Sequence, residues 1–339
     1  MPHAPAAVIY GMSGHRLTSG EQRLFSEVNP YGYILFARNC ESPQQVKKLV
    51  RDLREVSGRE RLPILIDQEG GRVARLKPPH WPEYPSAGAF AALYGRDREA
   101  ARRAVYLNAR LIAQDLYALG ITVNCAPVAD VPVRGAHDVI GDRAFGHDPE
   151  QVICLARAQA TGLMDGGIVP VLKHIPGHGR AQADSHKELP VVQTPPDTLR
   201  ATDFAPFAAL ANLPMGMTAH VVYAAIDGDR MATLSPKVID LIREDIGFQG
   251  LLMSDDISMK ALHGGVARCT REALAAGCDI VLHCNGEMKE MIAVAEGVTP
   301  LADGSRARAE AAMRSVGLPA PFDAAEARET VGRLLSEKA

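Results

Sequence analysis

Hydrophobic residues in this chain gather in short runs, and longer stretches with helical spacing separate those runs. Several runs, such as residues 168–172 and 251–253, have no polar residue at alternate positions, which is typical of strands that are covered on both faces. The pattern predicts eight strands, at residues 7–12, 33–37, 64–67, 122–127, 168–174, 215–222, 251–255 and 279–284.

The stretches between these strands carry the start and stop signals of helices. Thr18 and Ser42 are each followed three residues later by a glutamate or a glutamine, as in a capping box. Proline suits the first turn of a helix, and three further helices are predicted to begin at Pro149, Pro196 and Pro236. A long helix is predicted over residues 96–119, where the glycine that follows favours a stop.

Strands that alternate with helices form parallel βαβ units. Eight such units in 339 residues favour an α/β fold with a closed (β/α)8 barrel. An open doubly wound sheet is the alternative, but no glycine fingerprint of a dinucleotide fold follows the first strand. No linker or low-complexity segment divides the chain, so residues 1–339 are predicted to form a single barrel domain.

Composition restricts the partners of the protein. The chain is 47% hydrophobic and 23% charged, and its net charge of -3 argues against a nucleic-acid or anionic-membrane surface. No apolar run approaches the ~18 residues of a membrane span, and residues 1–12 lack the cationic start of a secretory signal. The six cysteines form no CxxC pair, which is typical of small core residues in a reducing compartment. We therefore expect a cytoplasmic protein that binds neither nucleic acid nor membrane.

Polar residues gather where the predicted strands end. The catalytic groups of a (β/α)8 barrel lie at the carboxyl ends of its strands, which meet on one face. Such residues follow five of the strands, namely Asp67, Asp130, Lys173 with His174, His220 and Asp255, and loops beyond the ends add Arg75 and Arg143. These residues are predicted to form one functional site. An acid here can also cap the next helix, a role that suits Asp256 better than Asp255 because a helix is expected directly after Asp256.

The segment after the fifth strand holds the densest candidate chemistry. Residues 173–179 read KHIPGHG, and Asp184 and His186 follow. Positions i and i+2 of an extended loop face the same side, so the Asp184 carboxylate can stabilise a protonated His186 that gives and recovers a proton. The same residues can also be incidental polar groups of a solvated loop, and His178 is left without a role. A connection as long as residues 175–195 is typical of segments that close over a substrate.

Five motifs follow one another in a characteristic order: IDQEGGRVARL (66–76), VIGDRAFG (139–146), KHIPGHG (173–179), ADSHKELP (183–190) and LLMSDDISM (251–259). Their order resembles glycoside hydrolase family 3 and, within it, the cytoplasmic β-N-acetylhexosaminidases of NagZ type. Two positions depart from the family pattern, because Ile175 stands where KHFPGHG has phenylalanine and Ile257 where SDDLSM has leucine. Both replacements are apolar.

The resemblance implies a retaining, two-step hydrolysis that releases terminal β-linked N-acetylglucosamine (GlcNAc). The implied substrates are GlcNAc-1,6-anhydro-N-acetylmuramic acid muropeptides from peptidoglycan recycling. Asp255 matches the nucleophile, His186 the general acid/base and Asp184 its dyad partner. The residues that match the sugar-binding set are Asp67, Arg75, Arg143, Lys173 and His174. No metal or cofactor is implied, and the expected partner is the sugar, bound by a monomer.

Three other functions would use the same kinds of residue. A phosphorylase is close in chemistry, because a histidine that has lost its proton repels phosphate less than a carboxylate does. A metal-dependent barrel hydrolase would use histidine and aspartate ligands, but no HxH pair leaves the first strand, and Arg75 and Arg143 would repel a cation. A non-catalytic sugar-binding protein would need the cations but not Asp184, His186 and Asp255.

Overall fold

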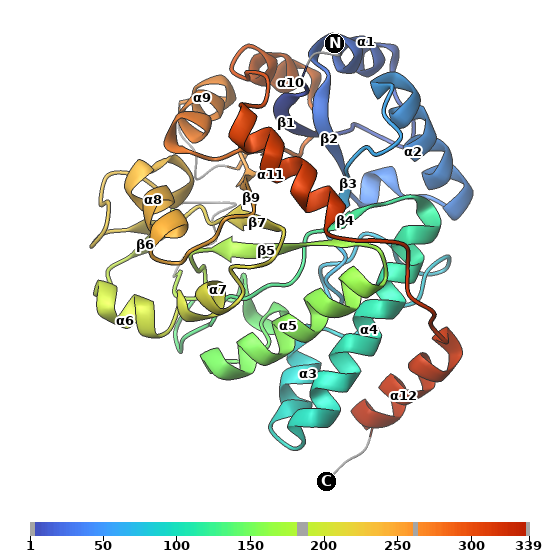
Figure 1. Cartoon of the computed structure of the whole chain (residues 1–339), viewed down its shortest axis with the longest axis vertical. Coiled ribbons are helices and arrows are strands. Elements are labelled where there is room, and N and C mark those ends of the chain that lie inside the picture. The colour runs from blue at the N-terminus through green and yellow to red at the C-terminus, as the bar shows by residue number, and fades with distance from the viewer. Residues whose placement is uncertain (1–3, 182–188, 260–263, 337–339) are drawn as a thin grey trace.

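The centre of the molecule is a closed barrel of parallel strands surrounded by helices, as a computed structural model describes for residues 4–181, 189–259 and 264–336 (Figure 1). The strands follow the order β1-β10-β9-β7-β5-β4-β3-β2 around the barrel. They are β1 (Ala6–Gly11), β2 (Pro30–Leu35), β3 (Ile64–Ile66), β4 (Val123–Asn124), β5 (Val169–Ile175), β7 (Met215–Thr218), β9 (Leu251–Asp256) and β10 (Ile280–His283). The predicted (β/α)8 barrel is confirmed.

Each predicted strand overlaps a strand of the barrel, and the fourth and the sixth are shortened the most, by four residues each. The fourth ends at Asn124 as β4, because the N–H of Ala126 turns back to the carbonyl of Asn124 and Pro127 has no N–H to donate to a neighbour. The sixth, predicted over residues 215–222, ends at Thr218. Val222, the last residue of the predicted run, instead begins β8 (Val222–Tyr223), which pairs with β6 (Val191–Val192) in a separate two-stranded sheet.

The helices are α1 (Ser19–Val28), α2 (Pro43–Ser57), α3 (Ala87–Tyr94), α4 (Arg98–Leu119), α5 (Pro149–Asp165), α6 (Pro196–Ala201), α7 (Ala205–Ala209), α8 (Pro236–Glu244), α9 (Val266–Ala276), α10 (Met288–Ala295), α11 (Asp303–Arg314) and α12 (Ala324–Ser336). The capping box at Thr18 is complete. Ser42 accepts the N–H of Gln45, but the Gln45 side chain takes the N–H of Glu41, so the second box is only half formed. Of the helices in the described segments, none has the length and apolar character needed to cross a membrane.

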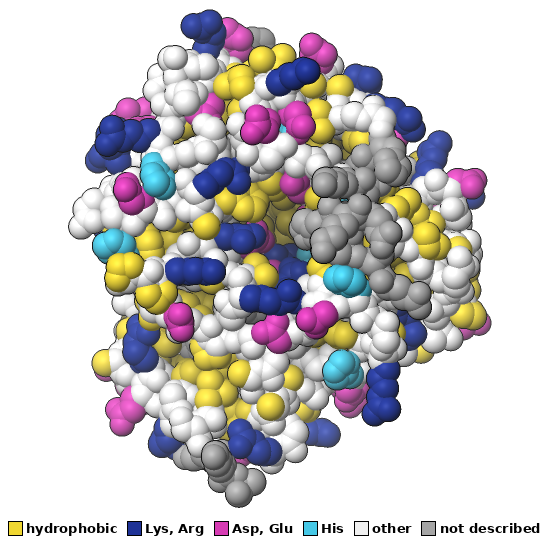
Figure 2. Space-filling view, turned by 180° about the vertical axis from the view of Figure 1, so that it is seen from behind, with side chains coloured by type: hydrophobic (Ala, Val, Ile, Leu, Met, Phe, Trp, Pro, Cys, Tyr) yellow, Lys and Arg dark blue, Asp and Glu magenta, His cyan; other side chains and the backbone are white. Residues whose placement is uncertain are grey.

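Apolar side chains fill the barrel, and α11 closes its amino-terminal end. Ile9, Val171 and Met253 belong to the buried cluster inside the barrel, and Ala309 and Ala312 of α11 belong to the same cluster. Figure 1 shows α11 lying across the barrel from this side. The opposite face, where the strands end, is hollowed at its centre (Figure 2).

Asp279, next to the amino-terminal end of β10, fastens α11 and α8 to the barrel. Its buried carboxylate accepts hydrogen bonds from Arg308 and Ser305 of α11, from Arg243 of α8 and from the backbone N–H of Leu252. Each of these donors loses its acceptor when the carboxylate is removed.

We expect Asp279→Ala to lower the free energy of unfolding by about 3 kcal/mol, since a broken buried ion pair leaves uncompensated charge. Urea unfolding followed by circular dichroism measures this loss. The control is Asp303→Ala, because the Asp303 side chain pairs with Arg306 on the same helix but is 93% exposed. Equal losses in the two variants would contradict the fastening role of Asp279.

Candidate active site

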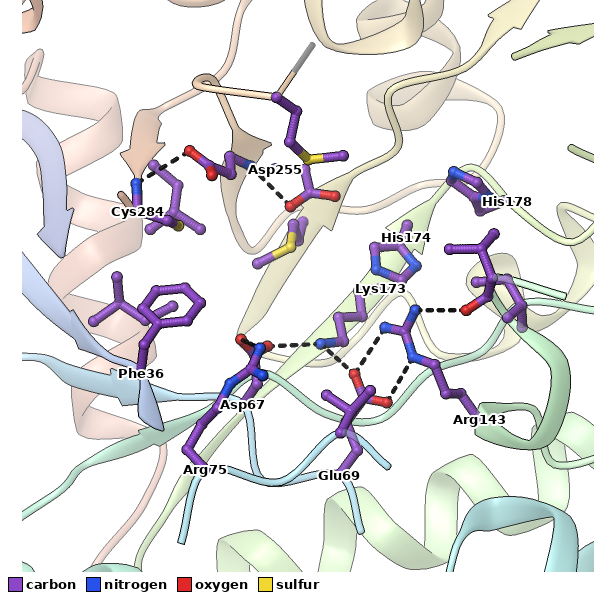
Figure 3. Close-up of a pocket in the computed structure, with 18 of the residues that line it drawn as sticks. Phe36, Asp67, Glu69, Arg75, Arg143, Lys173, His174, His178, Asp255 and Cys284 are labelled. Atoms are coloured by element: carbon purple, nitrogen blue, oxygen red, sulfur yellow. Dashed lines mark hydrogen bonds and ion pairs between the residues drawn. The ribbon is translucent and has the colours of Figure 1, made fainter. Parts of the chain in front are cut away.

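A pocket of about 340 Å³ lies at the carboxyl ends of the barrel strands. Side chains from separate strands reach it, namely Phe36 after β2, Asp67 after β3, Lys173 and His174 from β5, and Asp255 from β9 (Figure 3). Lysine and arginine side chains gather around the hollow on this face (Figure 2). The pocket is therefore polar and positively charged along part of its wall.

Lys173 and His174 are neighbours in the sequence, yet both line the pocket. Successive side chains of a regular strand point to opposite faces. Here the register of β5 against β7 shifts, because Lys173 pairs with Met217 whereas Ile175 pairs with Thr218. This irregularity at the end of β5 gives the site two adjacent functional residues from one strand.

Five charged side chains form a continuous network along one wall of the pocket. Lys173 Nζ lies 2.9 Å from Asp67 Oδ1 and 2.6 Å from Glu69 Oε1. Arg75 donates to the other oxygen of Asp67 at 3.0 Å. Arg143 holds Glu69 with two hydrogen bonds of 2.8 and 2.9 Å. With three cations and two carboxylates, the network carries a net positive charge and presents fixed donors to a ligand.

The network keeps its own members ionised. Burial works to raise the pKa of Asp67, but Lys173 and Arg75 hold that pKa below its usual range. In the same way, Lys173 and Arg143 overcome burial and lower the pKa of Glu69 to about 2. Burial would lower the pKa of Lys173, but the two carboxylates raise it above its ordinary value. Neither carboxyl group can therefore act as a proton donor near neutral pH.

The pKa of Glu69 leads to a pH-dependent difference between wild type and Glu69→Gln. At neutral pH the substitution is expected to lower the free energy of unfolding by about 3 kcal/mol, because two buried cations lose a counter-charge. Below about pH 4.5 the Glu69 carboxylate of the unfolded wild type takes up a proton, whereas that of the native state stays ionised until about pH 2. The stability advantage of wild type over Glu69→Gln therefore shrinks as the pH falls. Urea unfolding at pH 7, 5, 4 and 3 measures it. A difference that stays constant over this range would contradict the depressed pKa.

Asp130 orients His174. The buried Asp130 carboxylate lies 2.7 Å from His174 Nδ1 and accepts the backbone N–H of His178 at 2.6 Å. Burial opposes ionisation of Asp130, but His174 and His178 lower its pKa, so Nδ1 of His174 must donate. Burial and the neighbouring His174 lower the pKa of His178 to about 4. Both rings line the pocket (Figure 3).

Asp255, the next-to-last residue of β9, lies on the wall of the pocket across from Lys173 (Figure 3). Its Oδ1 accepts the backbone N–H of Asp256 at 2.8 Å, and no other described residue donates to its carboxylate. Burial works to raise the pKa of Asp255, but His220 and then His174 lower it. Asp255 is therefore an ionised acid that faces the ligand space.

Asp256 does not cap a helix, so this expectation is wrong. Residues 257–259 form turns and bends, and α9 begins at Val266 after Gly265. Asp256 instead accepts the N–H and hydroxyl of Ser258 and the backbone N–H of Cys284. Its carboxylate thus fixes the turn that follows β9.

The structure brings six of the predicted site residues around one pocket: Asp67, Arg75, Arg143, Lys173, His174 and Asp255. Asp184 and His186 lie outside the described residues. Sequence reasoning overlooked Glu69 and Phe36 as site residues. Glu69 stands two positions after Asp67, a spacing that could have suggested it, whereas the aromatic Phe36, with the Arg75 guanidinium 5.0 Å from its ring centre, gave no polar signal. Among the residues placed by the structure, no cluster of three or more His, Cys, Asp or Glu could hold a metal ion.

Comparisons with known proteins agree with this geometry. Residues 13–316 match the Glycosyl hydrolase family 3 N terminal domain. A Beta-hexosaminidase from Alkalilimnicola ehrlichii is 42% identical over 283 residues, which cover 82% of this chain and 80% of that protein. NagZ from Neisseria gonorrhoeae, solved in complex with N-trifluoroacetyl-D-glucosamine, is 32% identical with a TM-score of 0.89, covering 99% of this chain and 100% of that chain. A glycoside hydrolase family 3 β-N-acetylglucosaminidase from Paenibacillus is 30% identical with a TM-score of 0.84, covering 97% of this chain and 66% of that one.

Barrel, pocket and relatives together define a glycosidase. The chain belongs to glycosyl hydrolase family 3, among the β-N-acetylhexosaminidases of NagZ type.

Proposed function

We propose that the protein is a retaining β-N-acetylglucosaminidase that removes terminal GlcNAc from GlcNAc-1,6-anhydro-N-acetylmuramic acid and its peptides. The observation that carries this proposal is one ionised acid, Asp255, across the pocket from a network of fixed donors. In this proposal residues 1–339 act as one catalytic unit, a monomer that serves peptidoglycan recycling in the cytoplasm.

In the proposed mechanism Asp255 attacks the anomeric carbon and the glycosidic bond breaks. His186, with Asp184 as its partner, protonates the departing oxygen and later takes a proton from the water that releases the sugar. Asp67, Arg75, Arg143, Lys173 and His174 bind the sugar and orient its ring. The depressed pKa values of Asp67 and Glu69 support a donor other than these carboxyl groups.

The decisive experiment is mass spectrometry of the protein after reaction with a fluorinated N-acetylglucosaminide that turns over slowly. We expect a glycosyl adduct on the peptide that contains Asp255, and net retention at the anomeric carbon of an aryl substrate. An adduct on another peptide, or inversion, would overturn the assignment.

His186→Ala is expected to slow the enzyme in a manner that depends on the leaving group. We expect kcat for the natural disaccharide to fall by about 10²–10⁴-fold, the usual contribution of a general acid. An activated aryl leaving group needs no proton, so kcat for the aryl substrate should fall less. Steady-state kinetics with both substrates measures the ratio. The exposed His15 provides the control variant His15→Ala, which should change neither rate. Equal losses with both leaving groups would remove His186 from the acid role.

Two assays separate the competing reactions. Formation of glycosyl phosphate in phosphate buffer would indicate a phosphorylase. For a hydrolase, the rate of sugar release should not depend on the phosphate concentration. Full activity after exhaustive chelation would exclude a metal-dependent hydrolase, and measurable turnover would exclude a protein that only binds sugar.

A further inference from the structure

His220 lies two residues after β7 and takes no part in the pocket wall as far as the structure describes it. The side chain is fully buried, as are those of Thr218 and Thr233. Thr218 Oγ1 lies 2.8 Å from Thr233 Oγ1, which lies 2.7 Å from His220 Nδ1. On its other side, His220 Nε2 lies 3.0 Å from the carbonyl oxygen of Asp256. A buried chain of hydrogen bonds thus runs from the end of β7 to the end of β9.

The direction of the hydrogen bond between His220 and Asp256 follows from its acceptor. A backbone carbonyl can only accept, so His220 Nε2 must carry the hydrogen and donate it to Asp256. The Thr233 hydroxyl can donate either to Nδ1 or to the carbonyl of Ala219 at 3.2 Å, so Nδ1 accepts from Thr233 in the neutral imidazole and donates to it in the protonated one. Every polar atom of the imidazole is therefore satisfied, and the ring is held in one orientation.

The carbonyl that His220 binds belongs to the peptide group between Asp256 and Ile257. The N–H of the same peptide donates to the carbonyl of Leu282 at 2.8 Å. His220 and β10 thus fix this peptide from both ends. The N–H of Asp256, one peptide earlier, donates to Oδ1 of Asp255. The orientation of the Asp255 carboxylate therefore depends on a backbone that His220 holds.

We propose that His220 is a positioning residue for the Asp255 carboxylate, which it aims at the ligand through the backbone of Asp256. This inference rests on the proposed role of Asp255 as nucleophile. A histidine that only satisfied a buried carbonyl would contribute to stability and would affect sugar binding and chemistry alike. A positioning residue affects the chemical step and leaves the sugar-binding network of Asp67, Glu69 and Lys173 intact.

The test compares His220→Leu, His220→Gln and wild type. Glutamine carries an amide N–H at about the reach of imidazole Nε2, whereas leucine fills the space without a donor. Three quantities are measured: the rate of adduct formation with the fluorinated N-acetylglucosaminide, the Kd of free GlcNAc, and the Tm. The reagent used here carries fluoride as its anomeric leaving group, which departs without a proton, so the adduct rate reports on Asp255 and not on the general acid.

His220→Leu should slow adduct formation by about 100-fold, the effect expected of a reacting group misplaced by roughly 1 Å. The Kd of GlcNAc should stay at the wild-type value, and His220→Gln should recover most of the rate. Thr233→Val removes the hydroxyl that contacts Nδ1, and its rate of adduct formation should lie between those of wild type and His220→Leu.

Three results would overturn the positioning role: a wild-type adduct rate in His220→Leu, losses of rate and GlcNAc affinity in equal proportion, or a glutamine variant as slow as the leucine variant. If wild type forms its adduct on Asp255 in these cases, the proposed function stands. An adduct elsewhere in wild type would instead overturn the nucleophile itself, and the positioning role with it.

Discussion

Asp255→Asn is expected to lower kcat for an aryl β-N-acetylglucosaminide by at least about a thousandfold, because an amide cannot form the covalent intermediate. The carboxylate is ionised at neutral pH, and the substitution removes its charge while it keeps its shape. Steady-state kinetics gives kcat, and equilibrium titration with GlcNAc should show that binding survives. Asp255 makes no ion pair with the binding network, so sugar affinity should change little.

The matched control for this variant is Asp142→Asn. Asp142 is an acid near the pocket rim, and its half-exposed side chain pairs with Arg72. Its loss is expected to leave kcat unchanged, because an exposed ion pair contributes little. Near-normal turnover in Asp255→Asn would show that another residue is the nucleophile.

Lys173→Met is expected to weaken both the fold and the binding of sugar. The ammonium group lies between the carboxylates of Asp67 and Glu69 with only 3% of the side chain exposed. Its removal leaves two buried negative charges facing each other, which should cost about 3–5 kcal/mol in the free energy of unfolding. The Kd for GlcNAc should rise about 10- to 100-fold, the contribution of a hydrogen bond to a charged group.

Lys48→Met is the control variant, because it makes the same substitution at an exposed lysine. Lys48 pairs with Asp52 at 2.6 Å, but its side chain is 57% exposed. The unfolding free energy of this variant should stay within about 1 kcal/mol of wild type. Urea unfolding and GlcNAc titration of both variants make the comparison. A GlcNAc Kd unchanged by Lys173→Met would place the sugar away from the charged wall.

The barrel could be predicted from the sequence because its strands are buried on both faces and therefore appear as unbroken apolar runs. The same signal fails where an apolar run leaves the barrel. Residues 215–222 read as one strand, but Val222 donates its N–H to Pro190 and so belongs to another sheet. Only the partner, some thirty residues away in the sequence, distinguishes the two cases.

The residues of the candidate site could be predicted from the sequence, but the contacts between them could not. Polar residues at strand ends and the ordered motifs indicated Asp67, Lys173 and Asp255. That Glu69 shares Lys173 with Asp67, and that Asp130 holds His174, depends on contacts between distant segments. The register shift in β5 that turns Lys173 and His174 to the same side has no signature in the local sequence.

The position of α11 has a consequence for synthesis of the protein on the ribosome. The inside of the barrel is completed by Ala309 and Ala312, which are made after every strand of the barrel. A nascent chain that has already produced all the strands still exposes apolar side chains at the open base. We therefore expect the barrel interior to be fully covered during synthesis only after residues 303–314 have left the exit tunnel.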